Sequence, residues 1–134
     1  MLSKRERAEK VNAFLAVVGD CGRRFFRHDE RRARMEVDAR GHVWFVDDYS
    51  QKRIYTHHEG RWSGFSHGGT LRDLVRALRD HIRTGQYLPA HSLGPWPSWY
   101  SGGDPWAYGD DMVQVRQAAI DQGLLAPPAE AKAA

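Results

Sequence analysis

Residues 68–85 read Gly-Gly-Thr-Leu-Arg-Asp-Leu-Val-Arg-Ala-Leu-Arg-Asp-His-Ile-Arg-Thr-Gly, and this stretch decides the fold class. Its apolar residues recur at steps of three and four, which is the period of one face of an α-helix. Thr70 and Asp73 have the spacing of a capping box, and Gly85 is a typical stop signal. The pattern therefore predicts an amphipathic helix that ends at Gly85. Its apolar face consists of Leu71, Leu74, Val75, Leu78 and Ile82.

A helix is also predicted at each end of the chain. The first follows a capping box formed by Ser3 and Glu6, and its apolar residues repeat at helical spacing until Gly19. The second is expected over residues 110–123, because two aspartates favour a helix N-terminus and apolar residues then recur with helical period. Three helices are therefore expected in all.

Four short runs between the first two helices have the alternation of β-strands. The connections between them are short, and short connections join neighbouring antiparallel strands. The runs cover residues 24–28, 33–38, 42–47 and 53–57. We therefore expect an α+β fold with a small antiparallel sheet of three to four strands and about three helices. One domain should span residues 1–125, followed by a flexible tail at 126–134.

Composition narrows the class of protein. The chain has 134 residues, one cysteine and a formal net charge of +3. A single cysteine excludes an intramolecular disulfide, and neither a secretion signal nor a membrane-spanning segment is recognisable. A cytoplasmic location without a membrane partner is expected. The positive charge is weaker than that of dedicated nucleic-acid binders.

The central helix also carries a row of arginines beside its apolar face, and we call this row the arginine stripe. Such a stripe could follow a phosphate backbone or meet an acidic protein surface. The alternative is a solvated face whose arginines pair with nearby acids. The arginine stripe consists of Arg72, Arg76, Arg79 and Arg83.

Residues 94–109 are rich in aromatic residues, proline and glycine, so neither helix nor strand is expected there. Ordering such a loop costs entropy, so its rings either pack over the core or bind a partner. The candidate binding residues in this loop are Trp96, Trp99, Tyr100 and Trp106. Three nearby acids, Asp104, Asp110 and Asp111, could face a basic partner surface.

Aromatic residues alternate with arginine elsewhere too, as in Arg53-Ile54-Tyr55. This combination is typical of surfaces that stack the bases of single-stranded nucleic acid and contact its phosphates. The runs at 42–47 and 53–57 place large residues on both faces, which indicates either a sheet covered on both sides or an exposed aromatic patch.

No catalytic, metal or cofactor signature is recognisable, so we predict a protein that is not an enzyme and uses no metal or cofactor. Asp47 and Asp48 could perform acid–base chemistry with His57, but turn formation is the favoured interpretation. Gly68 and Gly69 lead into a helix N-terminus that could bind an anion, although a tight turn is the commoner role. Cys21 lies at a helix C-terminus, where a reactive thiolate is not expected.

Several segments of the chain form one combined pattern. In one-letter code they are CGRRFF at 21–26, VWFVDDY at 43–49, KRIYTH at 52–57, GFSHGGTL at 64–71 and GPWP at 94–97. In this combination the chain resembles a group of small proteins carried by phages, prophages and other mobile elements. The resemblance implies a context and carries over no functional residues.

Small phage proteins without catalytic motifs often act by occupying a host machine. The first hypothesis is therefore a non-catalytic protein that binds a host protein or nucleoprotein complex, such as an anti-CRISPR-like inhibitor of a defence nuclease. The alternative is a nucleic-acid-binding accessory protein that uses the arginine stripe and exposed aromatic side chains.

Overall fold

The computed structural model describes residues 2–21, 24–60, 62–89, 92–93 and 110–126. In these residues the helices are α1 (Lys4–Asp20), α2 (Gly69–Thr84) and α3 (Asp110–Asp121). Together with two small antiparallel sheets they form the α+β fold that the sequence predicted. Of the expected tail, only Ala126 lies within the described residues.

The start of α1 agrees with the sequence in atomic detail. The Ser3 hydroxyl accepts a hydrogen bond from the Glu6 amide at 3.1 Å, and the Glu6 carboxylate accepts one from the Ser3 amide at 3.0 Å. This is the predicted capping box. The helix continues through Gly19 to Asp20.

The start of α2 differs from the prediction. The N-cap is Gly68, whose carbonyl accepts the Arg72 amide at 3.1 Å, and no side chain caps the helix. The prediction of a capping box formed by Thr70 and Asp73 is therefore wrong, because the helix already begins at Gly69. Its C-terminus is as predicted: Gly85 adopts a φ of 79°, the left-handed conformation that glycine allows at helix ends.

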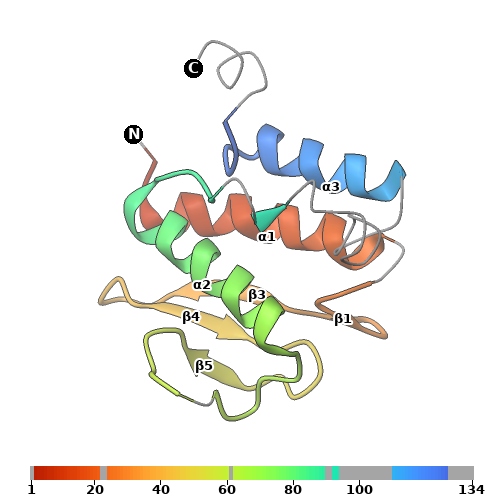
Figure 1. Cartoon of the computed structure of the whole chain (residues 1–134). Helices are drawn as coiled ribbons and strands as arrows, with labels where there is room; N and C mark the ends of the chain where they lie inside the picture. The colour runs from red at the N-terminus through yellow and green to blue at the C-terminus, as the bar shows by residue number, and fades with distance from the viewer. Residues whose placement is uncertain (1, 22–23, 61, 90–91, 94–109, 127–134) are drawn as a thin grey trace.

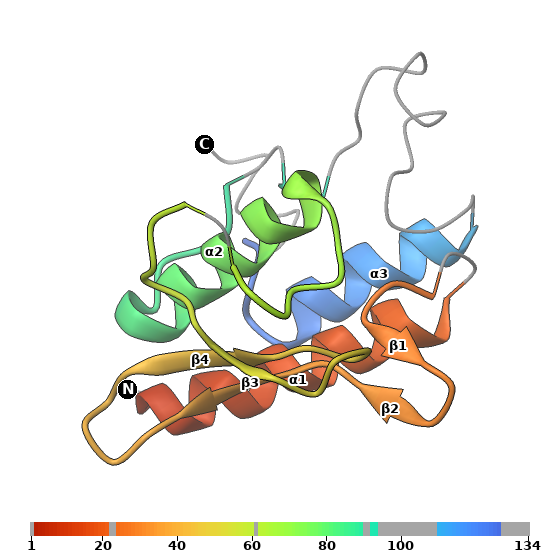
Figure 2. The ribbon, with the colours of Figure 1, turned by 90° about the horizontal axis from the view of Figure 1, so that it is seen from below.

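The strands form two sheets instead of one meander. The hairpin of β1 (Arg27–His28) and β2 (Arg31–Arg32) stands apart from the three-stranded sheet. Figure 2 shows this hairpin beside the C-terminal end of α1, where Asp20 pairs with both Arg27 and Arg32. The strand expected from residue 24 starts only at Arg27, because Arg24 and Phe26 adopt positive φ angles and break the extended backbone.

The three-stranded sheet has the order β3 (Arg34–Val37), β4 (Val43–Val46) and β5 (Arg53–Tyr55). Met35, Phe45 and Ile54 are neighbours across these strands and are buried in the core. The helices pack on this side of the sheet, with α1 against β3 and α2 against β4 (Figure 1). The core residues contributed by α2 are the five that the sequence predicted for its apolar face, together with His81.

One polar side chain of α1 fixes the edge of this sheet. The Asn12 amide group donates to the Met35 carbonyl at 3.0 Å and accepts from the Met35 amide at 2.7 Å. Both backbone groups of an edge-strand residue are thereby satisfied without a further strand. The edge strand β3 is thus held in register against α1.

Candidate nucleic-acid interface

The face of the three-stranded sheet opposite the core carries aromatic and charged side chains, and we call it the outer sheet face. Because side chains alternate along a strand, the row of Glu36, Trp44 and Tyr55 lies opposite the buried row. The rings of Trp44 and Tyr55 are 5.1 Å apart and half-buried. The sequence left open a sheet covered on both sides or an exposed aromatic patch, and the half-buried rings lie between these two alternatives. The outer sheet face comprises Arg34, Glu36, Trp44, Arg53 and Tyr55.

Two arginines of the outer sheet face share one carboxylate. Glu36 accepts hydrogen bonds from Arg34 at 3.1 Å and from Arg53 at 3.0 Å. The Arg53 guanidinium also lies 4.4 Å from the centre of the Trp44 ring, within cation–π distance. The Trp44 indole N–H donates to the Asp38 carboxylate at 2.9 Å, so the two cations beside this ring are balanced by two anions, Glu36 and Asp38.

Histidines surround the second ring of this face. His42, His57 and His58 lie 5.7, 5.4 and 5.2 Å from the Tyr55 ring, centre to centre. Burial, and after it the nearby charges of two α2 arginines, lowers the pKa of His57. His57 is therefore a neutral, stackable ring at neutral pH.

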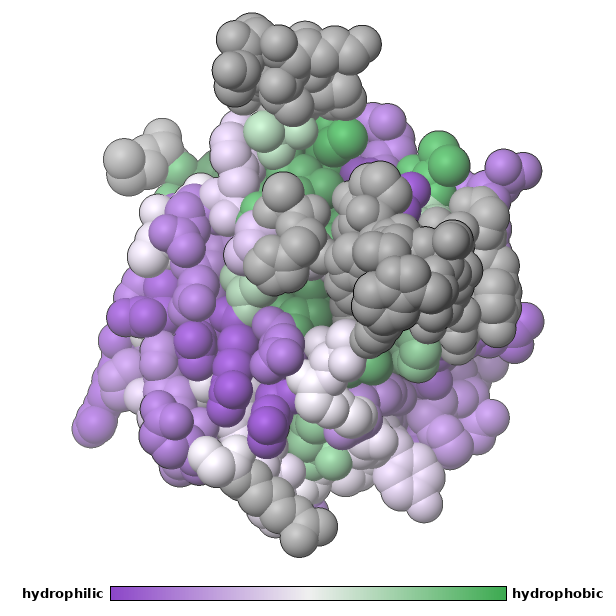
Figure 3. Space-filling model, in the orientation of Figure 1, coloured by the Kyte–Doolittle hydropathy of each residue, from purple (hydrophilic) through white to green (hydrophobic). Residues whose placement is uncertain are grey.

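The C-terminal half of the arginine stripe lies on α2, on the core side of the sheet, and contacts the backbone just after β5. Arg79 donates to the Thr56 carbonyl, directly after β5, at 2.7 Å. Arg79 and Arg83 share the carboxylate of Asp80, with N···O distances of 2.9 and 3.9 Å. This second cluster has two cations on one anion. Figure 3 shows hydrophilic residues gathered over α2.

The N-terminal half of the arginine stripe is used differently. Arg76 lies 5.4 Å from the Trp62 ring centre, and its guanidinium is 4.0 Å from the Asp73 carboxylate. Arg72 donates to the Gly60 carbonyl at 3.1 Å. The stripe is therefore divided among neighbouring loops and paired with nearby acids, and it is not a row of four free guanidinium groups.

The remaining predicted site residues lie at or before α3. Asp110 is exposed and Asp111 half-buried at the start of that helix. The other five belong to residues 94–109, outside the described part of the chain: Trp96, Trp99, Tyr100, Asp104 and Trp106. The structure does not bring Asp110 or Asp111 to the outer sheet face.

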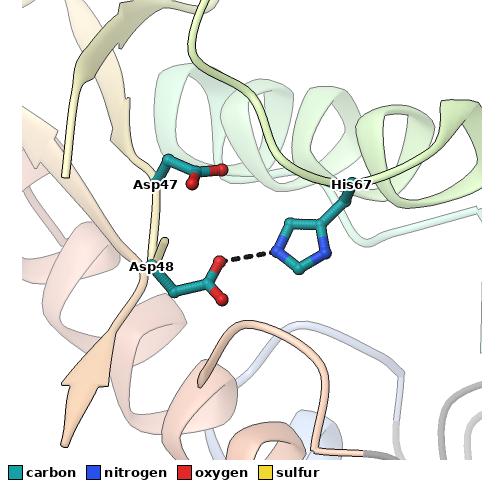
Figure 4. A group of neighbouring side chains, drawn as sticks. All are labelled: Asp47, Asp48 and His67. Carbon is teal, nitrogen blue, oxygen red and sulfur yellow. Dashed lines mark hydrogen bonds and ion pairs between the residues drawn. The ribbon is translucent and has the colours of Figure 1, made fainter. Parts of the chain in front are cut away.

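A second group of polar residues, which we call the Asp–His cluster, consists of Asp47, Asp48 and His67 (Figure 4). Asp47 is fully buried and accepts hydrogen bonds from the amides of Tyr49, Ser50 and Ser66 and from the Ser66 hydroxyl, at 2.9–3.0 Å. Burial opposes its charge, but these donors outweigh that effect and hold the pKa of Asp47 below its usual value. Asp47 thus forms the turn after β4, as the sequence favoured, and ties it to the loop before α2.

The partner of Asp48 was not predicted. Asp48 bonds His67 at 2.6 Å, whereas the sequence suggested His57 as its neighbour. The Asp48 side chain is 4 % exposed and the His67 side chain 15 %, so this is an almost fully buried pair. Nothing local in the sequence could reveal the contact, since it joins two loops that only the packing of α2 on β4 brings together.

A metal ion fits the Asp–His cluster poorly. Its three potential ligand atoms lie within 4.8 Å of one another. However, the two Asp47 oxygens already accept four hydrogen bonds, which uses the lone pairs that a metal would need. The cluster therefore acts as a clamp between two loops.

Cys21 is buried and free. Burial and the charges of Asp111 and Asp20 raise the pKa of its thiol. Those features make it a poor nucleophile, as its place at a helix C-terminus predicted.

Comparison with known proteins places the chain in a family. A sequence model described as YoqU matches residues 1–128, so the chain belongs to the YoqU family. It is 29 % identical over 123 residues to the SPbeta prophage-derived uncharacterized protein YoqU of Bacillus subtilis (strain 168), covering 90 % of this chain and 83 % of that protein. No solved structure matches. The prophage resemblance is therefore confirmed at the level of the family.

None of the described helices is both long enough and apolar enough to span a membrane.

Proposed function

We propose that the protein binds single-stranded nucleic acid on its outer sheet face. One observation carries the proposal: two clusters of paired arginines lie beside a continuous series of aromatic rings. Arg34 and Arg53 share Glu36, with Arg53 over the Trp44 ring. Arg79 and Arg83 share Asp80, and their charges act on His57. Single-stranded nucleic acid needs stacking rings and phosphate contacts side by side.

The charges of this surface favour a polyanion over a neutral ligand. Arg79 and Arg83 share the single carboxylate of Asp80, so their cluster keeps an excess positive charge. Arg34 and Arg53 are balanced by Glu36 and by Asp38, which accepts the Trp44 indole N–H. Arg53 and Arg83 are 46 % and 47 % exposed, so both remain accessible to phosphates. The half-buried rings of Trp44, Tyr55 and His57 form a connected series, and base stacking on such rings does not select a sequence.

The first hypothesis from the sequence, occupation of a host machine or inhibition of a defence nuclease complex, has less support. Three surfaces could serve it: the aromatic loop, the acidic third helix or the arginine stripe. The aromatic loop lies in residues 94–109, outside the described structure, Asp110 and Asp111 lie on α3, and the arginine stripe could serve either hypothesis. The prophage origin named for the Bacillus relative suits either function. A host protein partner is therefore an outcome of the test below.

The test is fluorescence anisotropy with a labelled single-stranded oligonucleotide of mixed sequence. Tyr55→Leu keeps an apolar side chain on the strand but removes the stacking ring, so we expect the Kd to rise about 5- to 150-fold. Arg53→Gln should flatten the dependence of log K on log salt by about 0.7, the value for one phosphate contact on a single strand. Tyr87→Leu is the matched control, because Tyr87 is an exposed tyrosine outside this face.

Two results would contradict the proposal. One is the absence of oligonucleotide binding at micromolar protein and physiological salt. The other is an equal loss of affinity in Tyr55→Leu and Tyr87→Leu. A third outcome would favour the host-machine hypothesis instead. In that case a host protein stays bound to the immobilised wild-type protein after nuclease treatment, and no oligonucleotide binds.

A further inference from the structure

We propose that a cavity at one end of the helical layer binds a small organic carboxylate that has an apolar body and an N–H or O–H group. The start of α1 and the ends of α2 and α3 lie on the same side of the molecule (Figure 1). The cavity between them has a volume of about 550 Å³, within the usual range of small-molecule sites. It lies among the helices, away from the outer sheet face, and goes beyond the proposed function. Its lining includes Leu2, Arg7, Lys10, His81, Tyr87 and Ile120.

The strongest indication is a buried histidine with one free nitrogen. His81 is 4 % exposed, and its Nδ1 bonds the Gln86 carbonyl at 2.7 Å. A carbonyl can only accept a hydrogen bond, so Nδ1 carries the proton. Burial, and to a smaller extent the charge of Arg7, lowers the pKa of His81. The imidazole is therefore neutral at pH 7, and its Nε2 keeps a lone pair.

This lone pair is accessible from the cavity. Nε2 has no hydrogen-bond partner within the described part of the chain, yet it is not sealed off, since among the described residues only the Nε of Arg72 is both fully enclosed and unpartnered. His81 is otherwise buried and lines the cavity, so the cavity is where a ligand reaches this nitrogen. A ligand with an N–H or O–H group would complete the hydrogen bonding of the imidazole.

Two cations of α1 favour an anionic ligand. Arg7 and Lys10 are three residues apart, so they lie on the same face of the helix. The half-buried Lys10 makes no hydrogen bond or ion pair with the described residues. The nearby carboxylate of Glu6 already accepts a hydrogen bond in the capping box of α1. The acid in the lining, Asp121, is exposed and accepts a hydrogen bond from Gln117 at 2.8 Å.

The negative ends of α2 and α3 are largely satisfied within the protein. Arg7 donates to two carbonyls in the last turn of α2, at 2.7 and 3.3 Å. At the end of α3 the amides of residues 122–125 bond the carbonyls of residues 118–120. Arg7 is thus committed to α2, and the ammonium of Lys10 is the anchor available to a carboxylate.

The apolar part of the wall defines the body of the ligand. Leu2 and Tyr87 are 40 % and 49 % exposed, and Ile120 is half-buried beside them. An apolar ligand body between these side chains would remove their surface from water. A hydroxylated aromatic acid and an apolar amino acid both combine such a body with a carboxylate and a hydrogen-bond donor.

An NMR titration of the histidine side chains tests the site directly. The probes are para-hydroxyphenylacetate, which offers an O–H donor, and L-phenylalanine, which offers N–H donors. The ¹⁵N signal of the unprotonated Nε2 of His81, assigned with His81→Phe, should shift progressively as it accepts a hydrogen bond. No shift of this signal with either probe at millimolar concentration would overturn the proposal.

Analogues without the donor test the assigned hydrogen bond and distinguish the two ligand types. Phenylacetate lacks the hydroxyl group of the first probe, and hydrocinnamate lacks the amine of the second. For the probe that binds, we expect the analogue to bind the wild-type protein at least about fivefold more weakly. His81→Phe should bind probe and analogue equally. Equal binding of probe and analogue by the wild-type protein would contradict the role given to His81.

Lys10→Met tests the carboxylate anchor and covers the case in which His81→Phe does not fold. Methionine keeps a long side chain but removes the charge, and we expect about tenfold weaker binding of the probe. Lys4→Met is the matched control, because Lys4 lies on the same helix, bonds the Gly41 carbonyl and does not line the cavity. Unchanged affinity in Lys10→Met, or an equal loss in both lysine variants, would refute the site. None of these measurements uses an oligonucleotide, so the proposed function can fail without affecting them.

Discussion

Replacing Asp47 by alanine should strongly destabilise the protein. The fully buried Asp47 carboxylate accepts from three backbone amides and one hydroxyl. Each buried donor left without a partner costs about 1–3 kcal/mol, and some of these amides can recover a water. For three amides we expect a loss of about 3–6 kcal/mol, a large part of the stability of an ordinary domain.

The assay is equilibrium unfolding in urea, followed by circular dichroism. Asp47→Asn keeps one carbonyl oxygen and should lose about half as much, which provides a measurable variant if the alanine protein is unfolded. Asp73→Ala is the control, because its carboxylate is 76 % exposed and makes only a 4.0 Å ion pair. A loss below about 1 kcal/mol for Asp47→Ala would show that the clamp between the two loops is not a stabilising element.

Three further outcomes follow from the structure. Hydrogen bonds from the Trp44 indole and the His42 amide lower the pKa of Asp38 to about 2, and the pKa of Asp47 is also lowered. Both carboxylates therefore stabilise the fold at pH values above the aspartate pKa of the unfolded chain, near 4. Acid titration of the melting temperature should therefore show stability lost as the pH falls from about 4 toward 2. Chelation with EDTA should leave the melting temperature unchanged, because the carboxylate oxygens of Asp47 are already saturated; a drop of many degrees would contradict this. Asn12→Ala should cost about 1–3 kcal/mol in urea unfolding, since it leaves two edge-strand groups of β3 unpaired, and a neutral effect would disprove the role given to Asn12.

The helices could be predicted from the sequence because their signals are local. The capping box of Ser3 and Glu6, the apolar face of α2 and the glycine at residue 85 each depend on neighbours within a few residues. The capping box at Thr70 failed because one local pattern competed with another. Gly68 and Gly69 allowed the helix to begin earlier, with no side chain as its cap.

The strand boundaries and the sites could not be predicted to the same degree. Arg24 and Phe26 adopt left-handed backbone conformations that delay the start of β1, and these residue types, which normally avoid positive φ, give no signal of it. The pairing of Asp48 with His67 depends on how α2 packs on β4. The sequence indicated Arg53 and Tyr55 as a candidate stacking motif. The position of the Arg53 guanidinium over the Trp44 ring could not be predicted without the register of β4 and β5.

Nucleic-acid binding on the outer sheet face is tested most directly by an NMR titration of the ¹⁵N-labelled protein with a single-stranded oligonucleotide. The indole N–H of Trp44, assigned with Trp44→Phe, and the amides of residues 53–58 should shift progressively with ligand. The amides of α3 should not move. Shifts confined to α3, or no shifts at concentrations that saturate a micromolar site, would contradict binding on this face.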